Sequence, residues 1–477
     1  MASPVNLSAA ADEQFANENF EFAMETYTEL AASDDPKAYY QLGVMHYKGL
    51  GVKADELQAL VWFSLAAAHQ YQNANELVEK LTTQMDPSHL EGLEILVQRA
   101  KLNAVKQPLF KQNRPQLNQG GLATKIEFGD YESLEAVELE LNLTDEYSNF
   151  GLGYVGSEDP LQGFDGDNSL GTNEGIFNGF PFFLVAEYDV GIDGSVRNIS
   201  ALQSGGSTAA GVRDLSLNTM PIPTFEGVPV HFFSRAYMGI AGYNKYRIRN
   251  EYRFFYRNVK DLVEKYRQAD SAEGRYNLAM ALMYFPWVER EAGAVGEALA
   301  SSAQDGYPLA MYEYGAKLYR EQQDPGQAIG WIYKAAAKGV TAAQYRLGRM
   351  LIDSPWVVSD EGKALFWLGE AASDGHIAAQ LKQADLKLFA GDSQHIDVVG
   401  AVELLSGIAA KQMENPEYHY LKAMTHFKMQ PREMPKTLLH IRRAIDLGHD
   451  LNWDVSEWED LLMGWTGEGY ITTEEWD

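Results

Sequence analysis

The stretch "GLGYVG", residues 151–156, is the first place in this chain where residue types and spacing suggest chemistry. It satisfies G-x-G-x-x-G, a pattern that binds a dinucleotide when it follows a strand and opens a helix. The residues that follow it, "SEDPLQGFDGD", are a poor helix start because they combine Pro with Gly and Asp. The sequence therefore predicts a loop here and no bound cofactor.

The acidic stretch "DGDNSLGTNEGI" suggests ion binding. Asp165, Asp167 and Ser169 have the spacing of ligands in a calcium loop. That loop needs Gly at its sixth position and Glu at its twelfth, where this chain has Leu170 and Ile176. We interpret the stretch as a solvated acidic loop, with an irregular ion site as the alternative.

No other motif in the sequence assembles a catalytic group. The chain has no cysteine, and its ten histidines form neither an H-E-x-x-H pair nor a cluster with ligand spacing. It has no G-x-S-x-G nucleophile elbow, and its acidic residues are so numerous that any catalytic pair chosen among them would be arbitrary. The sequence therefore predicts a protein that is not an enzyme, with no catalytic residue, no metal ligand and no cofactor.

The charge balance limits the class of partner. The chain carries 39 basic and 67 acidic side chains, which gives it a net charge of −28 at pH 7. A field of that sign repels phosphate backbones and anionic lipid surfaces, so we expect no nucleic acid partner. The longest apolar run, Leu278–Val288, contains Pro286 and is much shorter than the ~20 residues that span a bilayer. We expect a protein or peptide partner and no membrane span, and a small-molecule ligand stays unknown.

One segment, "YNKYRIRNEYRFFYRNVK", is basic in this acidic chain. Its basic residues, which lie beside four tyrosines, are Lys245, Arg247, Arg249, Arg253, Arg257 and Lys260. Such a mixture can bind acidic ligands. In a chain of this charge we favour a structural interpretation, in which the segment completes a sheet, begins the next helix and pairs with acidic neighbours.

The elements that must position all these residues begin with a β-hairpin in "AEYDVGIDGSVRNIS", residues 186–200. Ala186, Tyr188 and Val190 alternate with polar residues, and Asp-Gly ending at Gly194 is a turn signal. The second strand departs from the period of two, which predicts a bulge. A short helix and a return strand follow, so the sequence predicts a small β-β-α-β unit.

Helical repeats occupy most of the remaining chain. The stretch "QAIGWIYKAAAKGVTAAQYRLG" recurs 36 positions later as "KALFWLGEAASDGHIAAQLKQA". Glycines at matching positions, Gly43, Gly315 and Gly348, should let paired helices approach closely, while Trp331 and Trp367 fill the space beside them. A helical hairpin has an apolar face that it cannot bury alone, so the copies must stack into a solenoid.

These residues resemble the Sel-one-like repeat family, which is related to the tetratricopeptide repeat. Residues 38–67 match it most fully, and residues 15–30 and 417–448 resemble tetratricopeptide repeats. The resemblance implies stacked helical hairpins with a concave surface for a protein partner.

The central segment resembles the C-terminal domain of the TonB energy-transducer family. The residues that carry this resemblance are Asp193, Gly194, Val196, Ser204, Gly205, Pro223, Gly227, Pro229 and Val230. The resemblance implies a bacterial envelope setting and the capture of a peptide by an exposed sheet edge.

The predicted fold is multidomain and mainly α-helical, with helical-hairpin repeats flanking a small α+β domain. We expect N-terminal repeats over 1–107, a linker with irregular and β structure over 108–179, the TonB-like domain over 180–260, and C-terminal repeats over 261–477. The resulting function is that of a non-enzymatic interaction or scaffold protein of the bacterial cell envelope.

The predicted partner-binding residues are Val230, Phe232, Phe233, Ser234 and Arg235, because the last strand is the exposed one in the family that the segment resembles. We expect a periplasmic location, on the premise that a signal peptide precedes these residues in the gene, with the cytoplasm as the alternative. Two other functions stay open: an envelope hydrolase that uses carboxylates in the loop 145–180, and a cytosolic repeat scaffold.

Overall fold

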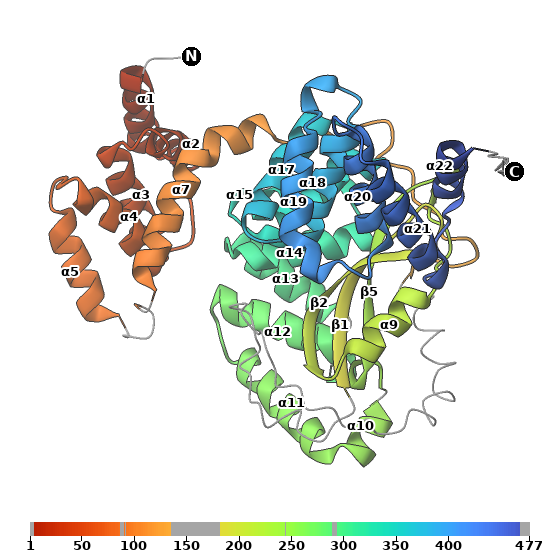
Figure 1. Ribbon diagram of the computed structural model, residues 1–477. Helices are drawn as coiled ribbons and strands as arrows, with labels where there is room; N and C mark the ends of the chain where they lie inside the picture. The colour runs from red at the N-terminus through yellow and green to blue at the C-terminus, as the bar shows by residue number, and fades with distance from the viewer. Residues whose placement is uncertain are drawn as a thin grey trace, which may run out of the picture.

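The structure is a computed structural model that describes residues 4–85, 90, 92–134, 182–243, 245–288 and 293–467, and most of its elements are helices. Figure 1 shows a lobe of N-terminal helices joined by one long helix to a larger body, where a small sheet lies within an arc of helices. The predicted mainly helical fold with a small α+β unit is confirmed.

The N-terminal lobe is built from paired helices. They are α1 (Pro4–Ala16), α2 (Phe20–Ala31), α3 (Pro36–Lys48), α4 (Glu56–Ala68), α5 (Ala74–Gln84) and α7 (Leu93–Gln112). Asp35 and Asp55 begin α3 and α4, because their carboxylates accept hydrogen bonds from backbone amides of the first turn. Helix α7 leaves the lobe (Figure 1), and its last turn packs on the body, where Phe110 stacks on Trp367 with ring centroids 5.2 Å apart.

The body is an array of helical hairpins. Its helices are α10 (Lys245–Glu251), α11 (Arg253–Arg267), α12 (Ala272–Tyr284), α13 (Ala294–Gln304), α14 (Pro308–Arg320), α15 (Pro325–Ala337), α16 (Thr341–Asp353), α17 (Glu361–Ser373), α18 (Ile377–Phe389), α19 (Val398–Ile408), α20 (Pro416–Lys428), α21 (Met434–Asp450) and α22 (Ser456–Thr466), with short 3-10 turns at η1 (Ile240–Gly242), η2 (Pro286–Val288), η3 (Ser393–His395) and η4 (Ala409–Lys411). From α12 to α21 each helix packs on the next. Asp324, Asp360 and Asp397 cap the second helix of three successive hairpins in the same way, which shows the repeat directly.

Glycines set the close approach of the two helices within a hairpin. A Cβ atom added to Gly43 would lie 2.7 Å from the ring of Phe63 in the paired helix. The nearest atoms would be 2.8 Å away at Gly315, and 2.7 Å away at Gly348, where the neighbour is Leu368. Real Cβ atoms do not approach other atoms this closely, so the predicted role of these glycines is confirmed.

The sheet has three antiparallel strands in the order β2-β1-β5. They are β1 (Phe182–Val190), β2 (Val196–Gly206) and β5 (Phe232–Gly239), with α9 (Ala209–Leu217) and a small hairpin of β3 (Thr224–Phe225) and β4 (Val228–Pro229) between the last two. Gly194 closes the β1–β2 turn with φ +80°. The pairing of β1 with β2 shifts register twice, which confirms the predicted bulge. The predicted order β-β-α-β is also observed.

The sheet and the C-terminal helices share one hydrophobic core. The core cluster joins Phe183 and Tyr188 of β1 to Leu347 of α16 and to Trp356, which follows α16. Helix α11 continues across residue 260, where the sequence analysis placed the end of the central domain. The central unit is therefore packed into the repeat array, and the division into four folding units stays a prediction.

Several predictions fall on residues outside the described part of the chain. These are the loop 145–180 with its carboxylates, the Gly-rich stretch 151–156, and the acidic stretch 165–176. Among the described helices, none combines the length and the apolar character that crossing a membrane requires. Among the described residues, no group of three or more acidic, histidine or cysteine side chains is arranged to hold a metal ion.

Candidate functional site

Two carboxylates of the central strand face the repeat helices. Glu187 and Asp189 are two residues apart in β1, so they point to the same side of the sheet. Their residues are only 6% and 2% exposed. Buried carboxylates need charged or hydrogen-bonding partners, because burial removes the water that stabilises their charge.

Asp189 is surrounded by donors. One of its oxygens accepts from Arg346 Nη1 at 2.6 Å. The other accepts from Tyr345 Oη at 2.8 Å, Arg349 Nη1 at 2.8 Å and Asn198 Nδ2 at 3.0 Å. Three of these four donors come from a single helix, α16, so Asp189 fixes the central strand to that helix.

Glu187 connects the same helix with α14. Its Oε1 accepts from Arg346 Nη2 at 2.6 Å and from Tyr312 Oη at 2.9 Å. Arg235 of β5 lies 3.6 Å from the other oxygen of Glu187 and donates to Glu313 of α14 at 2.9 Å. Both strands of this part of the sheet are therefore bound to both helices.

We call this set the interface network; its charged members are Glu187, Asp189, Arg235, Glu313, Arg346 and Arg349. Three of them are acids and three are bases, so the set is electrically balanced. The guanidinium of Arg346 also lies over the ring of Phe233, 3.8 Å from its centroid. Arg349 continues the network to Asp353 with a hydrogen bond of 2.7 Å.

Asp189 and Glu187 stay ionised in the interface network. Burial by itself would raise the pKa of Asp189, but the charges of Arg346 and Arg349 outweigh burial and hold that pKa below its ordinary value. The pKa of Glu187 is also lowered, because Arg346, Arg235 and Arg320 outweigh its burial. These side chains are 0–7% exposed. A substrate in solution does not reach these side chains, and their role is to attach the sheet to the helices.

A second contact attaches the tip of the β1–β2 hairpin to the end of the array. The carboxylate of Asp193 accepts from Arg197 at 2.8 Å and from the backbone amide of Asp454 at 3.0 Å. Arg197 lies over the ring of Trp453, 4.0 Å from its centroid. The turn residues that the sequence pointed to are therefore held by the segment between α21 and α22.

The predicted partner-binding residues lie mostly inside this interface. β5 is an end strand of the sheet. Val230 is half-buried, whereas Phe232, Phe233, Ser234 and Arg235 are 5%, 3%, 1% and 0% exposed. The expected exposure of this strand is therefore not found, and partner binding at these residues stays a prediction.

Aromatic packing explains why the strand is covered. Phe233 stacks on Tyr319 of α14 with ring centroids 5.2 Å apart. Phe232 packs on Phe128 at 5.1 Å, a residue of the segment that runs from α7 across the body. In that segment Ile126 exchanges backbone hydrogen bonds with the Gln322 side chain. A family resemblance in strand order carries no information about these covering elements.

Five members of the interface network were not predicted from the sequence: Glu187, Asp189, Glu313, Arg346 and Arg349. Both the strand with the carboxylates and the helix with the arginines carry a local signal in the sequence. Carboxylates at alternate positions of an otherwise apolar strand, and two arginines three apart in the small-residue helix "YRLGRM", are unusual for buried elements. The sequence does not predict that these carboxylates and arginines pair, because the partners are about 160 residues apart.

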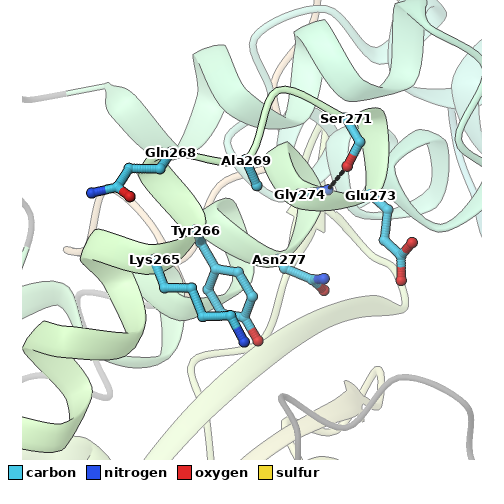
Figure 2. Close-up of a pocket in the computed structure, with 8 residues that line it drawn as sticks. All are labelled: Lys265, Tyr266, Gln268, Ala269, Ser271, Glu273, Gly274 and Asn277. Carbon is cyan, nitrogen blue, oxygen red and sulfur yellow. Dashed lines mark hydrogen bonds between the residues drawn. The ribbon is translucent and has the colours of Figure 1, made fainter.

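A pocket of about 380 Å³ lies at the turn between α11 and α12 (Figure 2). It is lined by Lys265, Tyr266, Gln268, Ala269, Ser271, Glu273, Gly274 and Asn277. The hydroxyl of Ser271 accepts from the Gly274 amide at 2.9 Å, so it caps α12 and is not activated by a neighbouring base. The lining combines the groups of a helix turn, and we assign no reaction to it.

Comparison with known proteins finds that the Sel1 repeat family model matches three segments of the chain, residues 36–71, 306–340 and 341–376. Each coincides with one helical hairpin, α3–α4, α14–α15 or α16–α17. The last two supply the helices that hold the interface network. No curated protein sequence matches the chain significantly.

The solved structures that are similar to the chain include the following two. One is a protective antigen of uropathogenic Escherichia coli with an SLR fold, which is 16% identical with a TM-score of 0.35 and is matched over 93% of this chain and 72% of its own. The other is a Sel1 repeat protein from Oxalobacter formigenes, which is 17% identical with a TM-score of 0.34 and is matched over 42% of this chain and 84% of its own.

Proposed function

We propose that the protein is a non-enzymatic scaffold that binds protein partners through its helical repeats. Sel1 repeat proteins are generally protein-interaction scaffolds. The observation that carries the proposal is the interface network, in which α14 and α16 of two Sel1 repeats hold an extended element, the sheet of the same chain. The repeats therefore already act as a binding surface, and part of that surface has an internal occupant.

The internal occupant changes where an external partner would bind. The helix faces next to β1 and β5 are covered, because the interface network and the aromatic rings of Phe233 and Tyr319 fill that contact. Exposed apolar side chains on other repeats stay accessible, such as Tyr47 on α3, which is 39% exposed, and Leu439 on α21, which is 65% exposed. The proposal places partner binding on these outer surfaces.

Site-specific photo-crosslinking tests the proposal on the intact protein. A photoreactive residue at Tyr47 or Leu439 should capture a defined protein from a native extract, because both positions lie on repeat surfaces. The control position is Val228, which is 61% exposed but lies on β4 outside the repeats. Capture at Val228 alone, or no protein captured at any of the three positions, would contradict a repeat-based scaffold.

We also propose that the scaffold works in the bacterial cell envelope. Support comes from the resemblance of the central segment to the TonB C-terminal domain. The test is to fractionate cells that express the protein from its own gene. Recovery with periplasmic markers is expected, and recovery with cytosolic markers would favour the cytosolic scaffold.

A further inference from the structure

The helices α10 and α11 carry a charge opposite to that of the whole protein. Residues 245–267 contain eight basic and three acidic side chains, a net charge of +5 in a chain with a net charge of −28. The segment does not complete the sheet, because the sheet ends at Gly239. It forms the first helices of the repeat array (Figure 1).

Helix α11 separates its apolar and basic residues onto opposite faces. Phe255, Val259 and Val263 recur every four residues and are buried. Basic side chains recur at similar spacing on the other side of the helix: Arg253, Arg257, Lys260 and Arg267. The end of a repeat array needs a polar outer face to stay in solution. An outer face of either charge would be polar enough. The positive charge of this face therefore requires its own explanation.

Most of these cations have no carboxylate partner in the described part of the chain. Arg247 pairs with Glu251 at 3.2 Å. Among the described residues, no ion pair involves Arg249, Arg253 or Arg257. Within the described residues, the expectation that the segment pairs with acidic neighbours is therefore met by Arg247 but not by Arg249, Arg253 or Arg257. Uncompensated cations on a surface attract an external anion.

The basic side of α11 also has a pocket. The pocket measures about 130 Å³, and its lining includes Lys245, Lys260 and Arg267 together with the ring of Trp287. That ring stacks on Tyr256 at 5.2 Å between centroids. Among the described lining residues, Glu264 is the carboxylate. A cavity of this size with three cations suits a single carboxylate or phosphate group.

Two exposed aromatic side chains lie among the basic residues of α10 and α11. Tyr246 is 79% exposed and Phe254 is 63% exposed. Exposed aromatic residues among cations are typical of recognition surfaces, because they contribute apolar contact area at low entropic cost. The surface therefore combines charge and apolar contact along the length of α11, about 22 Å for its fifteen residues.

We propose that this basic face, made of Lys245, Arg249, Arg253, Arg257, Lys260 and Arg267, binds an acidic peptide segment of a protein partner. The inference rests on the proposed scaffold function and names the chemistry of the partner. An extended peptide of about seven residues matches the length of α11. It places carboxylates along the basic stripe, with one of them in the pocket and an aromatic or apolar residue against Phe254.

Partner size favours a peptide over a membrane or a nucleic acid. Charges beyond about 8 Å are screened at physiological ionic strength, so a short segment experiences mainly the local positive field. A bilayer or a duplex would bring an extended anionic surface against the acidic remainder of the chain. The net charge of −28 opposes that approach.

The test uses the full-length protein and a fluorescent ten-residue probe peptide of Glu and Asp with one Tyr, followed by fluorescence anisotropy. The variant R253E/R257E/K260E should bind the probe at least tenfold more weakly than the wild type. A matched control, K80E/K411E/R442E, makes the same change of charge at exposed positions elsewhere and should stay within twofold of the wild type. Equal losses in both variants would overturn the proposal, because binding would then follow net charge.

Other occupants are separate outcomes of the same experiment. Tighter binding of anionic vesicles or of duplex DNA than of the peptide, lost in R253E/R257E/K260E, would overturn the peptide assignment. Residues 135–181 of the chain carry ten acidic and no basic side chains. A variant with these ten changed to amides should bind the probe as the wild type does; markedly tighter binding would identify the chain itself as the occupant and overturn the proposal.

The outcome also separates this inference from the proposed function. If partners crosslink at Tyr47 or Leu439 but no peptide binds at α11, the proposed scaffold function would hold. The basic face would then not be one of its binding sites. Circular dichroism and thermal unfolding of R253E/R257E/K260E serve as folding controls. Its three side chains are exposed and no described residue forms an ion pair with them, so the variant should unfold at the wild-type temperature.

Discussion

Arg346 of α16 donates to Asp189 of β1 at 2.6 Å across 157 residues of sequence, and both side chains are almost completely buried. The same guanidinium also bonds to Glu187. One helical residue of a Sel1 repeat therefore holds both carboxylates of the central strand. This contact joins the sheet to the repeat helices, beside the hydrophobic core that they share.

Asp189→Asn should destabilise the protein by about 3–5 kcal/mol. The amide leaves the charges of Arg346 and Arg349 buried without full compensation, and breaking one side of a buried ion pair typically costs this much. Denaturant unfolding, followed by circular dichroism, measures the change in the free energy of unfolding. The midpoints of the two proteins are compared at the same m-value, which is the slope of that free energy against denaturant concentration.

An exposed ion pair is the matched control for this substitution. Glu251 pairs with Arg247 at 3.2 Å and its side chain is 57% exposed. Glu251→Gln removes the same charge and should cost about 0–1 kcal/mol, because water replaces the lost contact. Similar costs for Glu251→Gln and Asp189→Asn would show that the interface network does not hold the sheet.

The sequence predicted each element of this interface but not the contact between them. Helices were predictable because Trp367 and Gly348 recur in register with earlier copies, and the hairpin was predictable because Gly194 marks its turn. Periodicity defines the faces of one element, whereas the meeting of two faces depends on the whole chain. The periodicity of the helix that carries Arg346 therefore did not predict that this side chain is buried.

The strand β5 shows the same limit for the candidate site. It was predicted to be an edge strand, and it is an end strand of the sheet. Its burial depends on Tyr319 in a repeat and on Phe128 in the segment after α7, which belong to neither pattern. The residue pattern predicted the order of the elements, and the burial of β5 comes from elements outside the predicted unit.

A double-mutant cycle should detect coupling between Arg235 and Glu313. Their hydrogen bond is 2.9 Å long, and the side chains are 0% and 6% exposed. Arg235→Met and Glu313→Gln should each destabilise strongly, whereas the double variant should cost at least about 1 kcal/mol less than their sum, because the partner left unpaired is also removed. Unfolding free energies of the four proteins give the coupling.

The exposed pair Lys111–Glu25 provides the reference cycle. Its side chains are 68% and 65% exposed. The coupling energy there should stay below about 0.5 kcal/mol. A coupling of this small size at Arg235–Glu313 would mean that the two residues contribute to the interface independently.

Gly348→Ala should destabilise the repeat array by about 1–3 kcal/mol. The added Cβ would lie 2.7 Å from Leu368 Cγ and 3.2 Å from its backbone nitrogen, so α16 and α17 would have to separate. Gly330 in α15 has no atom within 4 Å of the corresponding position. Gly330→Ala should therefore stabilise the helix by about 0.5–1 kcal/mol. Thermal unfolding compares the two; the same sign for both would refute close packing at Gly348.

Three stacked histidines between α20 and α21 predict a pH dependence. His419 Nε2 lies 3.0 Å from the carbonyl of Met413, which can only accept, so this nitrogen carries the proton. Neutral His419 then accepts at Nδ1 from His440 Nδ1, 3.1 Å away. The ring of His440 also stacks on His426. A proton added to His419 would place two donors against each other.

The pKa of His440 is lowered to about 4, first by burial and then by the charges of His419 and His426. The pKa of His419 is lowered as well, mainly by burial. In the unfolded chain a histidine titrates near 6.5. Between about pH 4 and 6.5 the unfolded state therefore binds more protons than the folded state, so stability rises with pH across this window and falls on acidification.

His440→Gln removes one of these titrations and keeps a hydrogen-bond donor. The wild type should lose more stability than His440→Gln between pH 7 and pH 4.5, with a difference on the order of 1 kcal/mol after solvent screening. The histidine rings face the same charged residues in both proteins, Lys422, Lys436 and Glu433. The comparison of the two proteins therefore cancels the contribution of these charges. Thermal midpoints at the two pH values measure the effect. Equal losses would show that His440 is protonated alike in the folded and unfolded chains, and the histidine stack would then have no part in acid sensitivity.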